Sequence, residues 1–321
     1  MKAILWCTAI VSSLAWSAQE SVELVTEETQ SVESEESYTP VEPQVPDSIT
    51  KRARDAQGLF RQRAIREAAT VDNPFVLTPH KPTYFLPIYY SSRLDEEAFL
   101  GASEADEDLD NTEFKYQLSL KFPIVYDVVG RNTSLWLGYT QLSYWQAYND
   151  TISAPFRDTN YEPELFITTQ PKSEFLGIKP EYVSYGVVHE SNGQSGALSR
   201  SWNRIYVDFL FEKENTAISI KPWYRFPENS ENDDNPDIDD YYGYGEIRLL
   251  HVIEDYSIDV LMRNNLDFSD NKGAFQIGVN FPLWGKSRGY LQYFNGYGQS
   301  LLDYNNHTQS IGLGIMLTNW L

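Results

Sequence analysis

From Tyr84 onward the sequence consists of segments of about ten residues in which apolar and polar side chains alternate. A period of two indicates β-strands, because successive side chains on a strand point to opposite faces. Polar or turn-forming clusters separate the segments, and no segment has a 3.6-residue apolar stripe over the length of a helix. Twelve strands are therefore predicted, at about 83–92, 113–122, 133–145, 162–170, 178–191, 201–213, 215–226, 242–253, 256–264, 273–283, 288–297 and 307–317.

The two faces of the predicted strands differ in character. In the last segment bulky side chains alternate with mostly small ones, with Ile311, Leu313, Ile315 and Leu317 on one face and Gly312, Gly314 and Met316 on the other. The links after the first, third and seventh segments are long and acidic, whereas those after the sixth and eighth contain only a couple of residues. Outer-membrane barrels combine an apolar outer face, short turns at one end, long loops at the other and an even strand count. The sequence therefore predicts an all-β fold, a twelve-stranded antiparallel transmembrane β-barrel, rather than a soluble sandwich.

The start of the chain has the form of a secretory signal peptide over residues 1–18, with one early lysine, an apolar centre and small residues at its end. The only cysteine, Cys7, lies within it, so the mature chain would have neither a disulfide nor a thiolate metal ligand. Residues 19–80 are predicted to form a disordered acidic tail and linker, which includes a short, solvated basic helix at 51–69. The barrel domain would span 81–321. No run of about 18 apolar residues follows the signal, so no membrane-spanning helix is expected.

The charge of the chain is strongly acidic. It has 25 Lys and Arg against 46 Asp and Glu, a formal net charge of -21. Proteins that bind nucleic acid need basic surfaces, so nucleic acid is excluded as a partner. An acidic surface instead attracts divalent cations, and the 22 Tyr and 8 Trp are typical of a protein at a boundary between water and lipid.

Three polar residues continue apolar stripes near one link of the barrel. His189 and Ser191 share a face of the segment 178–191, and Asn203 continues an apolar face of the next segment. A histidine can activate a serine nucleophile, and an asparagine can orient the imidazole without placing a charge in lipid. Glu190 has the opposite parity and would point into the lumen, so it is excluded from this triad. The spacing by itself is common, and the three could be ordinary polar residues beside a loop.

Gln141 also extends a lipid-facing stripe, which contains Leu135, Leu137 and Tyr139. A buried amide requires hydrogen-bond partners, which would lie either within the barrel or across a dimer interface. The residue is thus a candidate for a contact between two copies of the chain.

Several motifs resemble those of the outer membrane phospholipase A family. They are His189-Glu-Ser-Asn-Gly193, Ser199-Arg-Ser-Trp-Asn-Arg204, Gly138-Tyr-Thr-Gln-Leu-Ser143, Pro155-Phe-Arg-Asp-Thr-Asn-Tyr-Glu-Pro163, Lys221-Pro-Trp-Tyr224, Asp233-Asp-Asn-Pro-Asp237 and Gly296-Tyr-Gly-Gln-Ser-Leu-Leu-Asp-Tyr304. The resemblance covers roughly residues 80–321. It implies a Gram-negative outer-membrane barrel that hydrolyses acyl esters of glycerophospholipids, with phospholipase A1, A2 and lysophospholipase activity. The implied enzyme requires Ca²⁺ and acts as a homodimer in the outer leaflet.

The resemblance also implies a role for individual residues. Ser191 would be the nucleophile, His189 the base and Asn203 the orienting residue, and the Gly193 N–H would hold the oxyanion. Calcium would bind the backbone carbonyls of Gln194 and Ser199 and the side chain of Ser153 from the partner subunit, and Gln141 would be the interface amide.

The chain departs from the family pattern at two positions. A second calcium position uses two aspartates, but only Asp234 matches, because the other position is Gly196. The last residue is Leu321, where an aromatic residue is usual. Two further interpretations remain: a narrow porin or structural barrel, and a catalytically silent relative that senses phospholipid.

Overall fold

The computed structural model of the protein describes residues 58–71, 77–100, 108–174, 178–229, 231 and 233–320. All of these residues lie in one compact unit of the chain. The predicted signal peptide, and the predicted tail up to residue 57, lie outside the described residues. None of the helices in the described ranges is long and apolar enough to cross a membrane.

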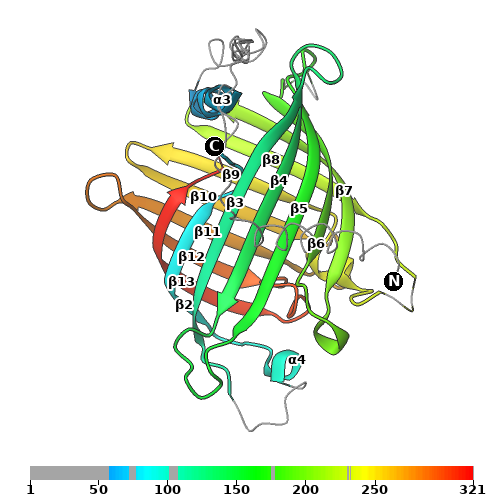
Figure 1. Ribbon diagram of the computed structural model, residues 1–321, viewed down its shortest axis with the longest axis vertical. Helices are drawn as coiled ribbons and strands as arrows, with labels where there is room; N and C mark the ends of the chain where they lie inside the picture. Colours follow the sequence, from blue (N-terminus) through cyan, green and yellow to red (C-terminus); the bar gives the residue numbers. More distant parts are fainter. Residues whose placement is uncertain are drawn as a thin grey trace, which may run out of the picture. The chain divides into compact units, whose positions relative to one another are not determined.

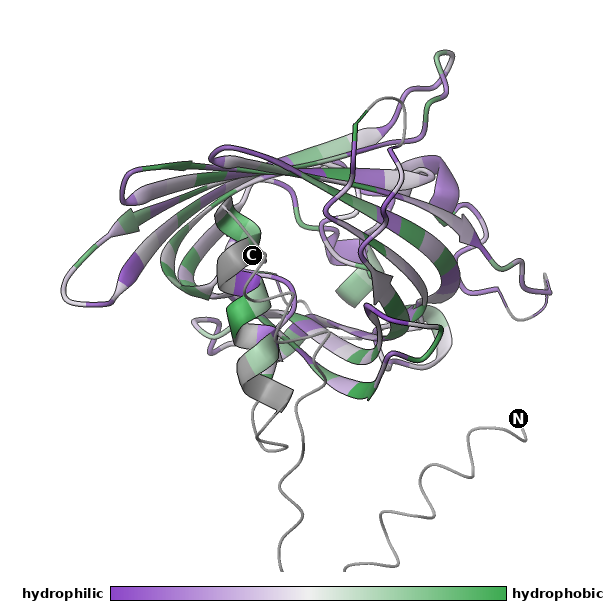
Figure 2. Ribbon diagram, turned by 90° about the horizontal axis from the view of Figure 1, so that it is seen from above, coloured by the Kyte–Doolittle hydropathy of each residue, from purple (hydrophilic) through white to green (hydrophobic). Residues whose placement is uncertain are grey.

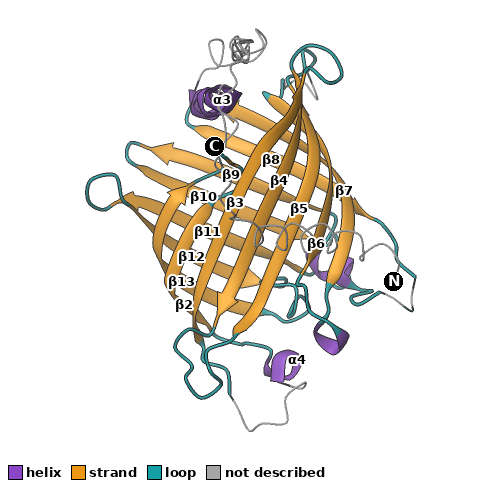
Figure 3. Ribbon diagram, viewed as in Figure 1, coloured by secondary structure: helices purple, strands orange, loops and turns teal. Residues whose placement is uncertain are grey.

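Twelve antiparallel strands close into a barrel (Figure 1, Figure 3). Each pairs with the next along the chain, and the last pairs with the first, which leaves no open edge in the ring. The prediction of a twelve-stranded antiparallel barrel is confirmed. The strands are β2 (Thr83–Ser91), β3 (Thr112–Tyr126), β4 (Thr133–Trp145), β5 (Phe156–Thr169), β6 (Tyr182–Ser191), β7 (Ser201–Lys213), β8 (Thr216–Arg225), β9 (Gly245–Ile253), β10 (Tyr256–Asn264), β11 (Gly273–Pro282), β12 (Arg288–Gly296) and β13 (Thr308–Thr318). A two-residue strand, β1 (Thr78–Pro79), pairs with β3.

Three strands, β3, β5 and β6, differ from their predicted ranges by several residues. β5 begins at Phe156 rather than at 162, because its charged residues Arg157 and Asp158 are buried inside the barrel instead of lying in a loop. β3 continues beyond Pro123 through an irregularity in its pairing with β4. β6 begins at Tyr182 rather than at 178.

Hydrophobic and hydrophilic residues alternate along many of the strands, as Figure 2 shows. The exposed fractions show that the apolar residues mostly lie on the outer face and that many polar residues are buried inside the barrel. On β13, for example, Leu313 is 48% exposed whereas Met316 is buried. Inward-facing side chains include the fully buried ammonium groups of Lys115 and Lys121 and the guanidinium of Arg157. A continuous apolar outer surface is incompatible with solvation by water and matches a lipid environment.

Helix α3 (Gly58–Val71) packs against the end of the barrel that carries the short turns. Phe60 is buried in a cluster that includes Tyr182, Leu210, Leu250 and Trp320. The prediction of a solvated helix is therefore wrong. The barrel provides an apolar surface for the helix, assembled from residues far apart in sequence. The narrow apolar face of the helix gave no indication of this surface.

Polar contacts hold the same helix. Glu212 of β7 accepts hydrogen bonds from the backbone N–H groups of Leu59 and Phe60 at the start of α3, where helix amides lack internal partners. The buried Glu67 pairs with Lys121 of β3 at 2.5 Å and with Arg63 at 2.9 Å. The helix is thus anchored at its first turn and again near its third.

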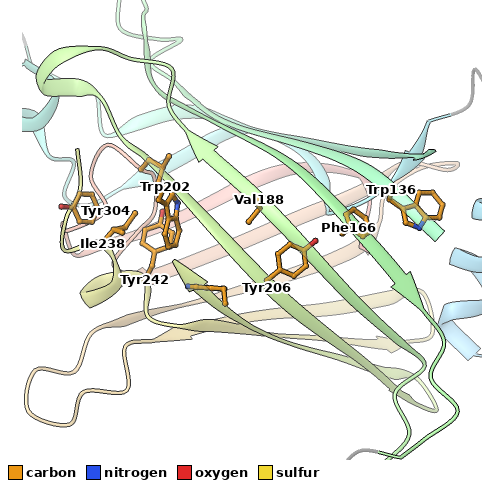
Figure 4. Close-up of a cluster of buried hydrophobic side chains, with 10 residues drawn as sticks. Trp136, Phe166, Val188, Trp202, Tyr206, Ile238, Tyr242 and Tyr304 are labelled. Atoms are coloured by element: carbon orange, nitrogen blue, oxygen red, sulfur yellow. The ribbon is translucent and has the colours of Figure 1, made fainter. Parts of the chain in front are cut away.

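The other end of the barrel carries the longer loops, which contain α4 (Glu96–Leu100), the 3₁₀ turn η1 (Gly196–Leu198) and α5 (Ile238–Tyr242). Figure 4 shows Ile238, Tyr242 and Tyr304 from these loops gathered beside Trp202 of β7. The Trp202 and Tyr242 rings meet edge to face with centroids 5.1 Å apart. These contacts pack α5, and Tyr304 of the link between β12 and β13, against the start of β7.

Candidate active site

The three residues of the predicted triad lie at the loop ends of β6 and β7. These strands pair in antiparallel register, with His189 directly opposite Asn203 and Ser191 opposite Ser201. The neighbouring outward residues Val187 and Ile205 are each 45% exposed, so this side of the two strands belongs to the apolar outer wall. The predicted parity of the three residues therefore matches the structure.

His189 and Asn203 form a direct hydrogen bond, with 2.9 Å between Nδ1 and Oδ1. The Asn203 Nδ2 in turn donates to Glu228 Oε1 at 3.2 Å. Among the described residues, no hydrogen bond joins Ser191 Oγ to the imidazole. In the absence of substrate, catalytic contacts are often long and close only when the substrate binds.

Glu190 faces the lumen, as its parity predicts. Its Oε2 accepts hydrogen bonds from Trp202 Nε1 at 3.0 Å and from Arg204 Nη2 at 2.6 Å. The lumen therefore holds this carboxylate in a charged network on the opposite side of the strand from His189. Glu190 has no place in the triad.

The loop 192–200 that follows β6 is organised by Asn192. This buried amide donates to the carbonyl of Leu198 at 2.8 Å and accepts from the N–H of Arg200 at 3.0 Å. Gly193 comes next, in the left-handed region at φ +66, and a Cβ there would lie 3.2 Å from the Tyr161 ring. The Gly193 N–H makes no hydrogen bond within the described residues, so it is available to a ligand near Ser191.

The loop 226–244 is tied to the same region by two contacts. Ser199 Oγ donates to Asp234 at 2.6 Å, and the N–H of Ser201 donates to the buried Asn235 at 2.9 Å. Arg225 pairs with Asp233 at 2.6 Å and holds the start of this loop. The conformation of the loop that bears Ser199 therefore depends on the acidic loop beside it.

The predicted metal ligands are divided between two loops. Gln194 and Ser199 belong to the loop 192–200, and the exposed Asp234 adjoins Ser199. Ser153 is exposed on the loop between β4 and β5, with a positive φ of 63. In the described part of the chain, no three His, Cys, Asp or Glu side chains form a group that could hold a metal. A site here would thus consist mainly of carbonyl and hydroxyl oxygens.

The structure also shows the surroundings of Gln141, the predicted interface amide, and of Gly196, the position at which the second calcium site lacks its aspartate. Gln141 donates from Nε2 to Ser143 Oγ at 3.1 Å and to Tyr116 Oη at 3.3 Å, so its amide has partners within the barrel. Gly196 has a φ of +65, and a Cβ added there would contact nothing within 4 Å.

Three residues at this site were missed by reasoning from the sequence: Asn192, Glu228 and Asn235. Asn192 lies inside the quoted motif, but its parity points away from lipid and its role depends on the fold of the following loop. Glu228 and Asn235 lie on a loop whose approach to β7 no local pattern indicates. Only contacts between β7 and that loop reveal them.

The fold and the site together define an outer-membrane β-barrel with a serine, a histidine and an asparagine on its lipid-facing wall. Comparison with known proteins identifies the family. A sequence model described as phospholipase A1 matches residues 60–317. Phospholipase A1 of Klebsiella pneumoniae is 37% identical over 248 residues, which cover 77% of this chain and 84% of that protein. Phospholipase A1 of Escherichia coli K12 is also 37% identical over 248 residues, which cover 77% of this chain and 83% of that protein. The chain therefore belongs to the phospholipase A1 family, a family of carboxylic ester hydrolases.

Two solved structures support this assignment. Outer membrane phospholipase A from Escherichia coli aligns with a TM-score of 0.72 at 36% identity, over 78% of this chain and 95% of that one. The Salmonella typhi outer membrane phospholipase, solved as a dimer with bound calcium, aligns with a TM-score of 0.71 at 35% identity, over 78% of this chain and 94% of that one. The predicted family and the outer-membrane location of the barrel are confirmed.

Proposed function

We propose that this protein hydrolyses acyl ester bonds of glycerophospholipids at the outer wall of its barrel, with A1, A2 and lysophospholipase activity. The observation that carries the proposal is the hydrogen bond between His189 of β6 and Asn203 of β7. His189 lies two residues before Ser191 on the same lipid-facing strand. Polar residues that face lipid are costly, so such a pair there supports a function. Membership of the phospholipase A1 family supports the same reaction.

In the proposed mechanism Ser191 Oγ attacks the ester carbonyl while His189 Nε2 takes the hydroxyl proton. Asn203 accepts from Nδ1–H and so leaves the Nε2 lone pair for that proton. The C–O bond then breaks, the imidazolium returns the proton to the leaving lysophospholipid alcohol, and an acyl ester of Ser191 remains. Water activated by the same imidazole hydrolyses this ester and releases the fatty acid.

Gly193 suits the role of oxyanion donor. Its N–H is free within the described residues, and it lies two residues after Ser191 in the left-handed conformation. A donor placed where charge develops is worth roughly a hundred- to a thousand-fold in rate. The nearby Tyr161 ring leaves little room for a side chain at Gly193.

The residues around Ser199 fit calcium. The candidate ligands are the carbonyls of Gln194 and Ser199 and the side chain of Ser153 of a second copy, and all are oxygen donors, as Ca²⁺ requires. The Ser199 carbonyl accepts a hydrogen bond from Arg200 at 2.7 Å, and a carbonyl oxygen has a second lone pair for a cation. Bound calcium would supply electrostatic stabilisation of the negative charge that develops on the ester oxygen. Of the two aspartates of the second calcium position only Asp234 is present, because Gly196 has no side-chain ligand.

The proposed active form is a homodimer. Calcium takes 6–8 oxygen ligands, more than the two candidate carbonyls of the loop 192–200, so a contribution from Ser153 of a second copy would help to complete the set. Gln141 lies on the outer wall of β4, one strand away from β5, and is the candidate interface amide. The dimeric Salmonella typhi relative with bound calcium supports this assembly.

The test is fatty-acid release from mixed phospholipid–detergent micelles, in calcium and then in chelator. Release that requires calcium and is abolished by Ser191→Ala, in a barrel that remains folded, supports the enzyme, the metal and the nucleophile together. The matched control is Ser201→Ala, the serine opposite Ser191 on β7, which should retain activity. Equal activity in Ser191→Ala and wild type would exclude this nucleophile. No release from the folded wild-type barrel in calcium would favour a silent or channel-forming barrel.

A further inference from the structure

Glu228 is the only partner of the Asn203 amide, within the described residues, that lies outside the predicted triad. It follows the end of β8 in the loop 226–244, and the N–H of Phe226 donates to the backbone carbonyl of Asn203 at 2.8 Å. That backbone contact brings the loop onto β7, and the Glu228 Oε1 then accepts from Asn203 Nδ2 at 3.2 Å. A half-buried carboxylate is thus linked through Asn203 to the imidazole of His189.

We propose that Glu228 is a positioning residue, which fixes the orientation of the Asn203 amide and, through it, the tautomer of His189. The inference rests on the proposed Ser191–His189–Asn203 triad and adds a fourth member to it.

The physical argument begins with the two ends of the amide. An asparagine side chain has a donor end and an acceptor end of nearly equal size, so shape alone does not choose between its two orientations. An ionised carboxylate only accepts hydrogen bonds. Glu228 therefore attracts Nδ2 and repels Oδ1, which leaves Oδ1 directed at His189.

The orientation of the amide then decides the state of the imidazole. With Oδ1 facing Nδ1, the neutral ring carries its proton on Nδ1 and keeps a lone pair on Nε2. In the flipped orientation Nδ2 would face Nδ1, and the neutral ring would carry its proton on Nε2. That ring could not take the proton of Ser191, so every flipped molecule would be inactive until the amide rotated back.

The location of Glu228 explains how a carboxylate can serve a site that faces lipid. Asn203 itself is neutral and meets the apolar wall, where a charge would be costly. Glu228 lies one hydrogen bond further on, in the loop beyond the strand end, and is only half-buried. The charge thus remains near water while its orienting effect reaches the imidazole through a neutral amide.

The experiment is a double-mutant cycle on the full-length barrel, with kcat and KM measured on phospholipid micelles in saturating calcium. Glu228→Ala is expected to lower kcat by roughly ten- to a hundred-fold, the scale of one hydrogen bond to a charged group, and to change KM by less than about two-fold. In an Asn203→Ala background the same substitution should change kcat by less than about two-fold, because the residue acts only through Asn203. Glu228→Gln, which retains an acceptor oxygen but can also rotate, should lie between wild type and Glu228→Ala.

The control is Glu231→Ala, which removes a charge from an exposed position on the same loop and should leave kcat unchanged. Equal losses from Glu228→Ala in the wild-type and Asn203→Ala backgrounds would show a general structural effect and overturn the proposal. So would a Gln variant no more active than the Ala variant, or a kcat unaffected by Glu228→Ala while Asn203→Ala is impaired. Full activity in Asn203→Ala would instead refute the triad itself, so the two failures are distinguishable.

Discussion

Replacing Phe60 by alanine should release α3 from the barrel while the barrel itself stays folded. The Phe60 side chain is 2% exposed, and its ring packs on Tyr182 with the centroids 5.4 Å apart. Truncating a buried phenylalanine costs about 3–5 kcal/mol. Because α3 is joined to the strands through a single small cluster and a few polar contacts, this cost should fall on the docking equilibrium. Each 1.4 kcal/mol is a factor of ten, so the undocked population should rise by about a hundred-fold or more.

Limited trypsin digestion in detergent measures that population. Cleavage after Arg63 requires an undocked helix, and in the slow-cleavage regime its rate follows the open fraction. The control is Ile65→Ala, which truncates a side chain that is 42% exposed on the same helix and should change the rate by less than about two-fold. The gel mobility of unheated samples verifies that the barrel is intact. Equal cleavage rates for the two variants would refute docking through the Phe60 cluster.

Three further predictions concern the proposed dimer interface, the proposed oxyanion donor and the effect of pH on the docking of α3. Gln141→Leu should weaken the dimer only modestly, since the amide also has partners within the barrel; sedimentation in detergent with calcium measures this, and an unchanged equilibrium would remove Gln141 from the interface. Gly193→Ala should lower kcat at least about ten-fold in a folded barrel, because a side chain at φ +66 costs about 1–2 kcal/mol and the donor must shift to relieve it; wild-type kcat would contradict the assignment. Burial by itself raises the pKa of Glu67, but the positive charges of Lys121 and Arg63 outweigh this effect and lower the pKa to about 2. Because the pKa is lowered, the ion pairs of Glu67 stabilise the docked helix fully above about pH 4.5, and this stabilisation is lost as the pH falls toward 2. Exchange of the α3 amides, corrected for intrinsic rates, should therefore be constant from pH 7 to 5 and accelerate below pH 5.

The barrel could be predicted from the sequence because its strands obey a local rule. A side chain on an antiparallel barrel strand faces either lipid or lumen, so the alternation in β4, β7 or β13 is visible without knowledge of any neighbour. The prediction failed where a strand carries buried charges. Arg157 is paired inside the barrel with Glu113 at 2.8 Å and with Asp303 at 3.0 Å, and only these distant partners make a strand of a segment that looks like a loop.

The same distinction applies to the candidate site. The shared parity of His189 and Ser191 placed both on the outer wall, and the strand register then brought Asn203 opposite His189. The contact of Glu228 with Asn203 depends on the path of the loop 226–244, which is set by bonds such as that between Arg225 and Asp233. The apolar surface on which α3 packs is likewise assembled from residues of several strands, β6 to β9, and from Trp320. Neither follows from a pattern within one segment.

The apolar surface on which α3 packs also constrains the order in which the protein can assemble. Phe60 lies in one cluster with Leu210 of β7, Leu250 of β9 and Trp320, which follows the last strand. A helix that leaves the ribosome before any strand therefore has no complete binding surface until the C-terminal residues are in place. The first part of the described chain to be synthesised is the last to find its site, so protection of α3 from protease would report that barrel closure is complete.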